Sequence, residues 1–413
     1  MQFIADFHIH SKYSRATSKD MDVKNIAHWA KLKGIQLMGT GDFTHHLWLE
    51  ELKSNLEPLD NGLFVYNDIH FILTAEISGI YSKGGRTYRI HNILFAPSFK
   101  VVDKINNALS AIGNLSSDGR PILGLDAEEL VRIVMDISPD CFVVPAHAWT
   151  PWFSVFGANS GFDSLEACFG KQLKHIYCLE TGLSSDPAMN WRLSALDNYS
   201  LISNSDSHSP SKIGREANVF DCELSYNDII NVLKTKDKRK FLYTIEFFPE
   251  EGKYHYDGHR NCGVRCTPDE SRKNNNLCPK CKKPLTIGVM NRVMQLADRP
   301  IGFVPENAIP YKNLIPLIEI VAEAKGVVTR TSQAAVREYS NLIGRFGTEL
   351  NLLLNVPEDE ISSAVSSRVA DGISRVRKGH VNIYPGYDGE YGKIEIFGKD
   401  EPKSKGEEQL SLF

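Results

Sequence analysis

Two histidines separated by one residue are the first side chains whose types and spacing could bind a metal ion. His8 and His10 close an apolar segment, residues 4–11, that reads as a buried strand. Alternate residues of a strand share a face, so the two imidazoles project together and can grip one cation. A polar strand end is the alternative reading, and the later segments of the chain decide between the two.

Six further apolar segments end in the same way, at residues 35–42, 70–76, 88–97, 141–147, 175–180 and 200–208. At or near their C-terminal ends they deliver Asp42 with His45 and His46, then Glu76, His91, His147, Glu180, Asp206 and His208. Any one of these side chains could be a structural hydrogen-bonding residue. Seven segments that end alike favour one shared metal site.

Helical stretches separate these segments and would position their ends. Residues 21–33 carry an apolar stripe closed by Gly34, and residues 126–137 carry another, capped by Asp126. Strands that alternate with helices predict a parallel sheet whose chemistry lies at the C-terminal face of a barrel.

Clustered imidazoles and carboxylates suit the hydrolysis of a phosphate ester. The negative charge of such an ester repels a nucleophile. Divalent ions neutralise that charge, lower the pKa of a water molecule and stabilise the departing oxygen. Mixed nitrogen and oxygen ligands favour zinc, iron or manganese over magnesium alone.

Size and composition limit the class of protein. A chain of 413 residues, 42% hydrophobic and 10% aromatic, is long enough for two or three domains. It lacks a run of about eighteen apolar residues, and we expect neither a membrane span nor a signal peptide. The net charge of −4 gives no general attraction to nucleic acid. We expect a cytoplasmic monomer, associated with the nucleoid in a prokaryote.

Four of the eight cysteines form two short-spaced pairs that predict a structural zinc ribbon. These residues are Cys262, Cys266, Cys278 and Cys281. The first pair has three intervening residues rather than the commoner two, and His255 and His259 are nearby substitutes. The other cysteines are scattered, which predicts buried thiols in a reducing compartment.

The pattern changes after residue 222. A basic run at 234–240 is either a solvated surface or a contact for a phosphate backbone. Further on we predict helices at 316–324 and 358–378, a strand at 349–355, a strand, glycine-rich loop and strand at 381–397, and a disordered tail. The predicted domains are a barrel (1–222), a connector with the ribbon (223–285), a small mixed α/β domain in contact with DNA (286–397) and a tail (398–413).

The order H-x-H, Asp-rich turn, Glu, His, His and D-x-H resembles the polymerase-and-histidinol-phosphatase (PHP) domain over residues 1–222. The resemblance implies a distorted seven-stranded β/α barrel with two or three divalent metals, and catalytic roles for His8, His10, Glu76, His147, Asp206 and His208. It implies that His8, His10, Glu76 and Asp206 bind a first metal, with Glu76 bridging, and that His91 and His147 bind a second. His208 with Asp42 or His45 would bind a third, and Glu180 belongs to the expected ligand set. Many relatives carry another His or Asp where this chain reads Lys12-Tyr13-Ser14-Arg15, so the third metal stays open.

A PHP domain followed by a four-cysteine ribbon and a mixed domain resembles the endonuclease Q family over nearly the whole chain. Gly39-Thr40-Gly41-Asp42 and the stretches 145–152, 180–184, 203–210 and 214–216 carry the resemblance. It implies an enzyme that nicks DNA 5′ to deaminated bases (uracil, hypoxanthine, xanthine) and at abasic sites.

The chemistry of deaminated bases makes this substrate class reasonable. Uracil and hypoxanthine share an O=C–N–H edge that the parent bases lack, and one pocket could pair with both. Reading that edge requires the nucleotide to be flipped out of the duplex. The aromatic residues after His147 could wall such a pocket, although this spacing is also typical of a core: Trp149, Trp152, Phe153 and Phe156.

Two other functions stay open. A small-molecule phosphatase of the histidinol-phosphatase kind would use the same metals but would not need a ribbon. A DNA-binding repair scaffold with an inactive metal site would bind damaged DNA without cutting it.

The last five residues, Gln-Leu-Ser-Leu-Phe, resemble the short peptide by which repair and replication proteins bind the sliding clamp. Leu412 and Phe413 would fill an apolar pocket, and Gln409 would form a hydrogen bond at its rim. A frayed chain end is the alternative reading.

Overall fold

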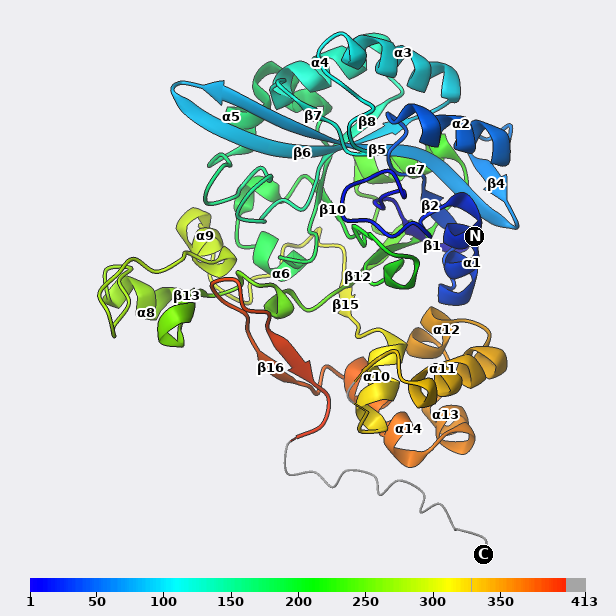
Figure 1. Ribbon diagram of the computed structural model, residues 1–413, viewed down its shortest axis with the longest axis vertical. Coiled ribbons are helices and arrows are strands. Elements are labelled where there is room, and N and C mark those ends of the chain that lie inside the picture. The colour runs from blue at the N-terminus through cyan, green and yellow to red at the C-terminus, as the bar shows by residue number, and fades with distance from the viewer. Residues whose placement is uncertain (328, 399–413) are drawn as a thin grey trace, which may run out of the picture.

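The strand that leads to His8 and His10 lies inside the largest sheet of the computed structural model, which describes residues 1–327 and 329–398 (Figure 1). Eleven strands form this sheet: β1 (Gln2–Asp6), β2 (Leu37–Gly39), β3 (Glu57–Pro58), β4 (Phe64–Tyr66), β5 (Ile69–Lys83), β6 (Arg86–Ala96), β7 (Ile122–Leu123), β8 (Phe142–Pro145), β11 (Ala217–Asp221), β12 (Phe241–Glu246) and β15 (Tyr311–Asn313). Its order is β15, β12, β11, β1, β2, β5, β4 and β3, with β6 and β7 paired to β5, and β8 to β6.

The prediction of a parallel sheet is correct for β1, β2 and β5 and wrong for β6, which is antiparallel to both of its neighbours, β5 and β8. β5 and β6 form a long antiparallel hairpin, in register from Leu73–Ala96 to Lys83–Arg86. The turn is the reason, because Gly84 and Gly85 both have positive φ, 59° and 78°, as a two-residue hairpin turn requires.

The strands that carry Glu180 and Asp206 form a separate pair. β9 (Cys178–Glu180) and β10 (Ser200–Ile202) are parallel. Single bridges link Val143 to Ile176 and Ile9 to Ser207, so this pair lies between β8 and the segment that follows β1. The mixed α/β fold is confirmed, and the number of strands in a closed barrel stays a prediction.

Helices cover the sheet at the top and right of Figure 1. As predicted, Gly34 ends α1 with φ 87°, and the Asp126 side chain caps α4 by accepting from the Glu129 N–H. The helices before residue 240 are α1 (Val23–Lys33), α2 (His46–Asn55), α3 (Phe99–Ser110), α4 (Ala127–Ile137), α5 (Leu165–Phe169), α6 (Pro187–Asn190) and α7 (Tyr226–Thr235). The scattered cysteines are buried, as expected: Cys141, Cys168, Cys178 and Cys222.

The sheet continues past the predicted boundary at residue 222, since β12 and β15 are hydrogen-bonded into it. The ribbon projects from this body at the left of Figure 1, with β13 (Asp257–His259), β14 (Val264–Cys266) and α8 (Pro268–Lys273). α9 (Val289–Leu296) returns to the body, where Arg292 donates to the backbone oxygens of Phe156 and Phe162. The domain limits stay a prediction.

The lower region is more helical than predicted. Residues 349–355, predicted as a strand, form α12 (Glu349–Leu354), because Thr348 caps its N-terminus and buried Glu349 accepts from the N–H of Leu317 and the Tyr339 hydroxyl. A short apolar run does not distinguish strand from helix by its pattern alone. The other helices are α10 (Leu317–Ala324), α11 (Gln333–Phe346), α13 (Glu358–Ala364) and α14 (Ser367–Arg377), the last two replacing the single helix predicted at 358–378.

The strand, loop and strand predicted at 381–397 form the hairpin of β16 (Asn382–Tyr384) and β17 (Lys393–Glu395). The predicted clamp-binding residues Gln409, Leu412 and Phe413 lie outside the described residues. Within the described ranges, every helix is too short or too polar to span a lipid bilayer.

Candidate metal centre

The Glu76 carboxylate lies between two pairs of histidines. Its Oε2 is 3.6 Å from Nε2 of His8 and 3.3 Å from Nε2 of His10. Its Oε1 is 2.7 Å from Nδ1 of His91 and 3.1 Å from Nε2 of His147. Each oxygen therefore faces a separate group of nitrogen ligands, which is the arrangement of a carboxylate that bridges two metal ions.

The strands explain this convergence. Glu76 lies in the middle of β5, not at its end as predicted, and His91 reaches it from β6 because Ser78 and His91 are cross-strand partners. His8 and His10 follow β1, and the His10 N–H donates to the Ser207 oxygen, which ties that segment to the loop carrying Asp206. His147 follows β8.

A third group joins the first through His10. Asp206 Oδ1 is 3.1 Å from His10 Nε2, and the His208 ring lies 4.5 Å from the His10 ring, centroid to centroid. His10, Asp206 and His208 thus offer three ligand atoms within 4.8 Å of one another. His208 was predicted to bind a third metal with Asp42 or His45, and it lies instead with His10 and Asp206. His45 stacks on Tyr13 and belongs to none of the metal-capable groups among the described residues.

Several atoms of the cluster fit metal ions better than hydrogen bonds. Nε2 of His8, Nε2 of His10 and Oδ1 of Asp206 are buried without a hydrogen-bond partner in the described part of the chain. A buried polar atom without a partner costs free energy. Three such atoms that converge beside Glu76 match the nitrogen and oxygen ligands of zinc, manganese or iron.

Two predicted ligands have a different place. Oδ1 of Asp42 is 3.0 Å from Nδ1 of His10, and Oε1 of Glu180 is 3.0 Å from Nδ1 of His8. Each carboxylate therefore faces the ring nitrogen that points away from Glu76. Such contacts set the tautomer and orientation of a metal-binding histidine. Asp42 and Glu180 orient ligands and belong to none of the described metal-capable groups.

The other two histidines are oriented by hydroxyl groups. Nε2 of His91 lies 3.0 Å from the Ser78 hydroxyl, and Nδ1 of His147 lies 3.1 Å from the Thr150 hydroxyl. The nitrogens that remain, Nδ1 of His91 and Nε2 of His147, are the ones that face Glu76.

Burial and charge shift the protonation of the cluster in opposite directions. Burial alone would lower the pKa of His8, but Glu180 and Glu76 raise it well above its ordinary value. For His91, burial lowers the pKa to about 4 against the opposing effect of Glu76, which favours the neutral form that binds a metal. Burial would raise the pKa of Glu76, yet His91, Arg120 and His8 hold it well below its usual range.

Three site residues have left-handed backbone conformations that ordinary side chains adopt rarely. The φ angles are 51° at Asp42, 30° at His147 and 46° at Asp206. Such conformations cost about 1–3 kcal/mol each and persist where the surrounding structure holds them. At these three positions the chain gives up some stability to aim the side chains at the cluster.

Arg120 is a site residue that the sequence analysis missed. Its Nη1 lies 3.1 Å from Oε2 of Glu76, although it belongs to an irregular segment between α3 and α4. Neither a strand end nor a periodic pattern marks this position in the sequence, so only the folded chain brings it to the metal ligands.

The ribbon also offers four ligand atoms, but not the four predicted. They come from His259, Cys262, Cys278 and Cys281, all within 4.8 Å of one another. Cys266 is buried and lies outside this group. The spacing explains the correction, because His259 and Cys262 have two intervening residues, as Cys278 and Cys281 do.

One thiol of the ribbon cluster is prepared for a cation. Desolvation alone would raise the pKa of Cys278, but the backbone N–H groups of Cys281 and Lys280 lower it to about 6. A thiolate is the form that binds zinc. Nδ1 of His259 lies 3.3 Å from Sγ of Cys281.

A cavity of about 840 Å³ adjoins the metal ligands. Trp152 and Phe153 line it, as predicted, together with Phe247 and Tyr254. The Phe153 ring lies 4.7 Å from the His91 ring, centroid to centroid.

Two of the four aromatic residues predicted for a pocket do not line this cavity. Trp149 and Phe156 are buried against each other, and the Trp149 indole donates to Asn190, so both belong to the core.

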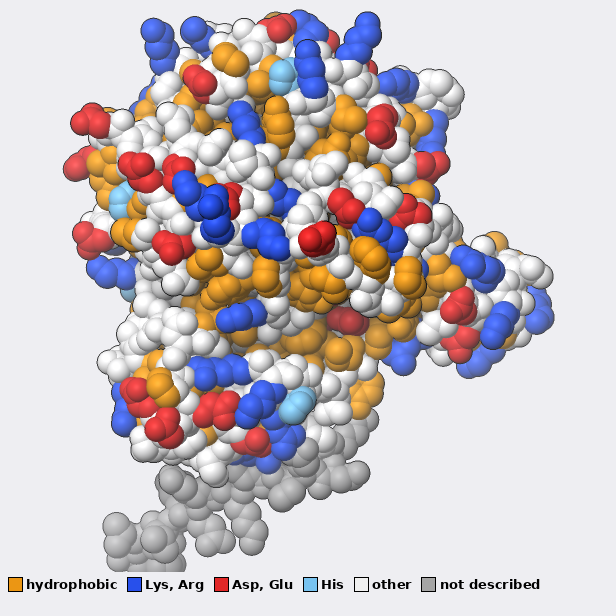
Figure 2. Space-filling model, turned by 180° about the vertical axis from the view of Figure 1, so that it is seen from behind, with side chains coloured by type: hydrophobic (Ala, Val, Ile, Leu, Met, Phe, Trp, Pro, Cys, Tyr) orange, Lys and Arg blue, Asp and Glu red, His pale blue; other side chains and the backbone are white. Residues whose placement is uncertain are grey.

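Seen from behind, hydrophobic side chains gather in a band on the surface between the β/α body and the helical region (Figure 2).

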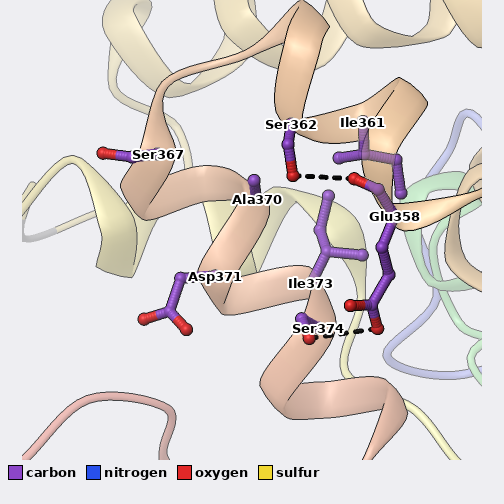
Figure 3. Close-up of a pocket in the computed structure, with 8 residues that line it drawn as sticks. All are labelled: Glu358, Ile361, Ser362, Ser367, Ala370, Asp371, Ile373 and Ser374. Atoms are coloured by element: carbon purple, nitrogen blue, oxygen red, sulfur yellow. Dashed lines mark hydrogen bonds between the residues drawn. The ribbon is translucent and has the colours of Figure 1, made fainter.

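A second hollow, of about 340 Å³, lies between α13 and α14 (Figure 3). The Ser362 hydroxyl donates to the Glu358 backbone oxygen, and the Ser374 hydroxyl donates to the Glu358 carboxylate. None of the residues that line it belongs to a metal-capable group in the described chain. The metal ligands and the larger cavity therefore define the candidate site.

Known proteins are similar to this chain over stretches that together cover nearly all of it. The family described as the MJ0043 C-terminal domain matches residues 316–380. The uncharacterized protein MJ0043 of Methanocaldococcus jannaschii is 34% identical over 259 residues, which are 60% of this chain and 31% of that protein. This chain thus spans about a third of MJ0043. The uncharacterized protein YqxK of Bacillus subtilis is 28% identical over 410 residues, which are 95% of this chain and 98% of that protein.

Two crystal structures are similar over nearly their full length. One is the lesion-specific endonuclease PfuEndoQ from Pyrococcus furiosus, with a TM-score of 0.86 and 34% identity, covering 96% of this chain and 95% of that one. The other is endonuclease Q in complex with a 27-mer duplex that carries an abasic lesion at the active site. It has a TM-score of 0.85 and 34% identity, and the match covers 99% of this chain and 100% of that one.

Proposed function

We propose that this chain, which belongs to the endonuclease Q family, is a metal-dependent DNA repair endonuclease. It hydrolyses the phosphodiester 5′ to a deaminated base (uracil, hypoxanthine or xanthine) and at abasic sites. One observation carries the proposal: Glu76 faces two histidine pairs, with unpartnered atoms of His8, His10 and Asp206 beside it. Endonuclease Q has been crystallised with an abasic lesion at its active site, which supports this substrate class.

The residues of the cluster divide the work. His8, His10, Glu76 and Asp206 would hold one divalent ion, His91 and His147 with Glu76 a second, and His208 with Asp206 would contribute to a third. Divalent ions at these positions supply Lewis-acid charge neutralisation and an acidified water. Asp42 and Glu180 keep the ligand nitrogens of His10 and His8 aimed at the cluster.

The cavity beside the ligands suits a nucleotide flipped out of the duplex. Trp152, Phe153 and Tyr254 supply apolar surface for a base, and Lys212 and Arg215 supply positive charge for its phosphates. Uracil and hypoxanthine share one donor and acceptor edge, so a single set of polar groups would accept both and leave a buried group unpaired against cytosine or adenine. An abasic site enters most easily, because it has no base pair to break.

The test is a set of labelled duplexes with a single abasic site, uracil, hypoxanthine or unmodified base, incubated with protein and Mn²⁺, Zn²⁺ or Mg²⁺. We expect a nick on the 5′ side of each lesion, lost with a chelator and absent from unmodified DNA. Release of phosphate from small esters without nicking would instead indicate a phosphatase, and binding without cutting would indicate an inactive scaffold. Metal analysis of the same sample measures the number and identity of the ions.

We further propose that Gln409, Leu412 and Phe413 bind a sliding clamp, although they lie outside the described residues. The support is the peptide itself, which follows a charged segment able to act as a flexible tether. Deletion of residues 409–413 should abolish clamp binding in calorimetry and leave nicking of a short free duplex unchanged. Clamp affinity equal to that of the full chain would contradict the proposal.

A further inference from the structure

We propose that Arg120 is a catalytic residue that binds a non-bridging oxygen of the scissile phosphate. This inference rests on the proposed nuclease function and deepens it, because it assigns the phosphate contact to a side chain that no metal-ligand pattern includes. The Arg120 guanidinium contacts the carboxylate that faces both histidine pairs, with Nη1 3.1 Å from Oε2 of Glu76.

The guanidinium has donors to spare at the mouth of the site. Its side chain is 27% exposed, whereas Glu76 is 1% exposed. Nη1 is the one nitrogen of this guanidinium with a hydrogen bond to a described residue, and its other nitrogens are not among the buried atoms without a partner. They therefore reach solvent beside the metal ligands, where a substrate phosphate would lie. A planar guanidinium binds phosphate oxygens with two parallel hydrogen bonds.

The segment that carries Arg120 is held in place from several sides. The Asp118 carboxylate accepts from the N–H groups of both Arg120 and Arg15. The Gly119 N–H donates to the Tyr13 oxygen, and the Ser78 N–H donates to the Pro121 oxygen. These bonds fix the segment against the H-x-H loop on one side and β5 on the other.

Gly119 shows how closely this segment approaches the metal ligands. A Cβ atom added at this position would lie 2.3 Å from both Oδ2 of Asp42 and Oγ of Ser14, which is less than any real contact. The chain thus brings its backbone against the carboxylate that orients His10, and it places the Arg120 side chain next in sequence. A surface side chain without a function would not require the backbone to approach Asp42 so closely.

A structural role is the competing explanation, since a cation beside Glu76 could simply neutralise it. That role would be redundant once metals bind, because a divalent ion already neutralises the carboxylate and repels a neighbouring guanidinium. A phosphate anion at the same place reverses the balance, since it is attracted to both the metal ions and the arginine.

The experiment is a chemical double-mutant cycle between Arg120 and the scissile phosphate. Binding of an abasic duplex is measured in Ca²⁺ with either a normal phosphate or a neutral methylphosphonate at the cleavage position, for the wild type and for Arg120→Ala. We expect the methylphosphonate to weaken wild-type binding by about tenfold more than binding by the variant. Nicking by Arg120→Ala in Mn²⁺ should fall by about 100-fold or more, and Arg120→Lys should recover part of the loss.

Arg15→Ala is the matched control. Arg15 lies beside the same segment, 82% exposed and 3.8 Å from Asp118, and its backbone N–H is unaffected by the substitution. This variant should show the wild-type methylphosphonate penalty. The metal content of each variant is measured in parallel.

Three results separate the possible failures. An equal methylphosphonate penalty in the wild type and Arg120→Ala would overturn the phosphate contact, and loss of metal from Arg120→Ala would show instead that Arg120 positions Glu76. A wild type that neither nicks nor binds the abasic duplex would remove the proposed function itself, whatever Arg120 does.

Discussion

The two metal-capable clusters of this chain are built in opposite ways. The cluster around Glu76 draws its ligands from residues 8 to 208, so strands far apart in the sequence must assemble before it exists. The ribbon cluster draws its ligands from residues 259 to 281. The cluster around Glu76 is buried among extensive apolar packing, whereas the buried apolar cluster of the ribbon consists of Val264, Cys266, Cys278 and Leu285.

From this difference we expect the cluster around Glu76 to use metal ions for catalysis and the ribbon to use its metal ion for folding. The large apolar core around Glu76 should fold without the ions, so it can hold unpartnered ligand atoms ready for them. The ribbon buries little apolar surface, and we expect a bound zinc ion to supply the free energy that its folding needs. Removal of each metal site should therefore affect different measurements.

The sharpest test removes one predicted ligand of the cluster around Glu76. His8→Ala or Asp206→Ala should reduce nicking by about 1,000-fold or more, because each loses several kcal/mol of metal-dependent stabilisation of the transition state. The melting temperature should stay within a few degrees of wild type, since neither side chain packs in the apolar core. Nicking rate and thermal unfolding of the same sample measure the contrast, and full activity of either variant would place the catalytic cluster elsewhere.

The complementary test removes two ribbon ligands. Cys278→Ser with Cys281→Ser should release about one zinc ion per chain and expose the ribbon to proteolysis, because structural zinc supplies on the order of 10 kcal/mol of folding free energy. DNA binding should weaken, while any metal bound by the cluster around Glu76 should remain. Elemental analysis and limited proteolysis measure this result. An unchanged zinc content would contradict the ribbon site.

The identity of the fourth ribbon ligand can be tested separately. His259→Ala should lose the zinc ion, and Cys266→Ala should keep it, because the His259 imidazole and not the Cys266 thiol lies with the other three ligand atoms. Zinc titration of the two variants under one buffer condition compares them. The reverse result would support the ligand set predicted from the sequence, in which Cys266 and not His259 binds the zinc ion with the other three cysteines.

Residues that orient ligands should have smaller effects than the ligands themselves. Asp42→Asn and Glu180→Gln keep shape but weaken the contacts to His10 and His8, and we expect a loss of roughly 10–100-fold in metal affinity or nicking. Metal titration of nicking measures this change, with Glu57→Gln as an exposed control. A loss as large as that of His8→Ala would make these carboxylates ligands after all.

The smallest effect concerns Glu246, a buried carboxyl group at the end of β12 in the main sheet. Burial raises the pKa of Glu246 from 4.5 to about 8, with hydrogen bonds from Thr244 and Thr181 opposing the rise. Between these values the folded protein holds a proton that the unfolded chain has lost. The free energy of unfolding therefore falls as the pH rises from about 5 to about 8.

Glu246→Gln removes this titration, since glutamine does not ionise and keeps the contacts to both threonines. The variant should lose less stability than the wild type over that range, by on the order of 1 kcal/mol or more. Denaturant unfolding at pH 5.5 and pH 8 measures the difference. Parallel loss in both proteins would mean that Glu246 is ionised throughout.

The sequence by itself determined the chemistry available to this chain. The polar ends of seven apolar segments predicted His8, His10, Glu76, His91, His147, Asp206 and His208 as one group, and the structure brings them together. The sequence could predict this group because each residue follows or interrupts a buried strand, and the apolar pattern of a buried strand is a strong local signal. The caps of α1 and α4 were predictable for the same reason, since capping depends on a few adjacent residues.

Only the tertiary structure decided which role each polar residue takes. Asp42 and Glu180 carry the same sequence signal as Glu76, but they face the outer ring nitrogens of His10 and His8. Arg120 carries no signal that separates it from surface residues, because its importance comes from Glu76, which is distant in the sequence. A pattern records which side chains can bind, whereas the distance and direction between two side chains exist only after the strands have paired.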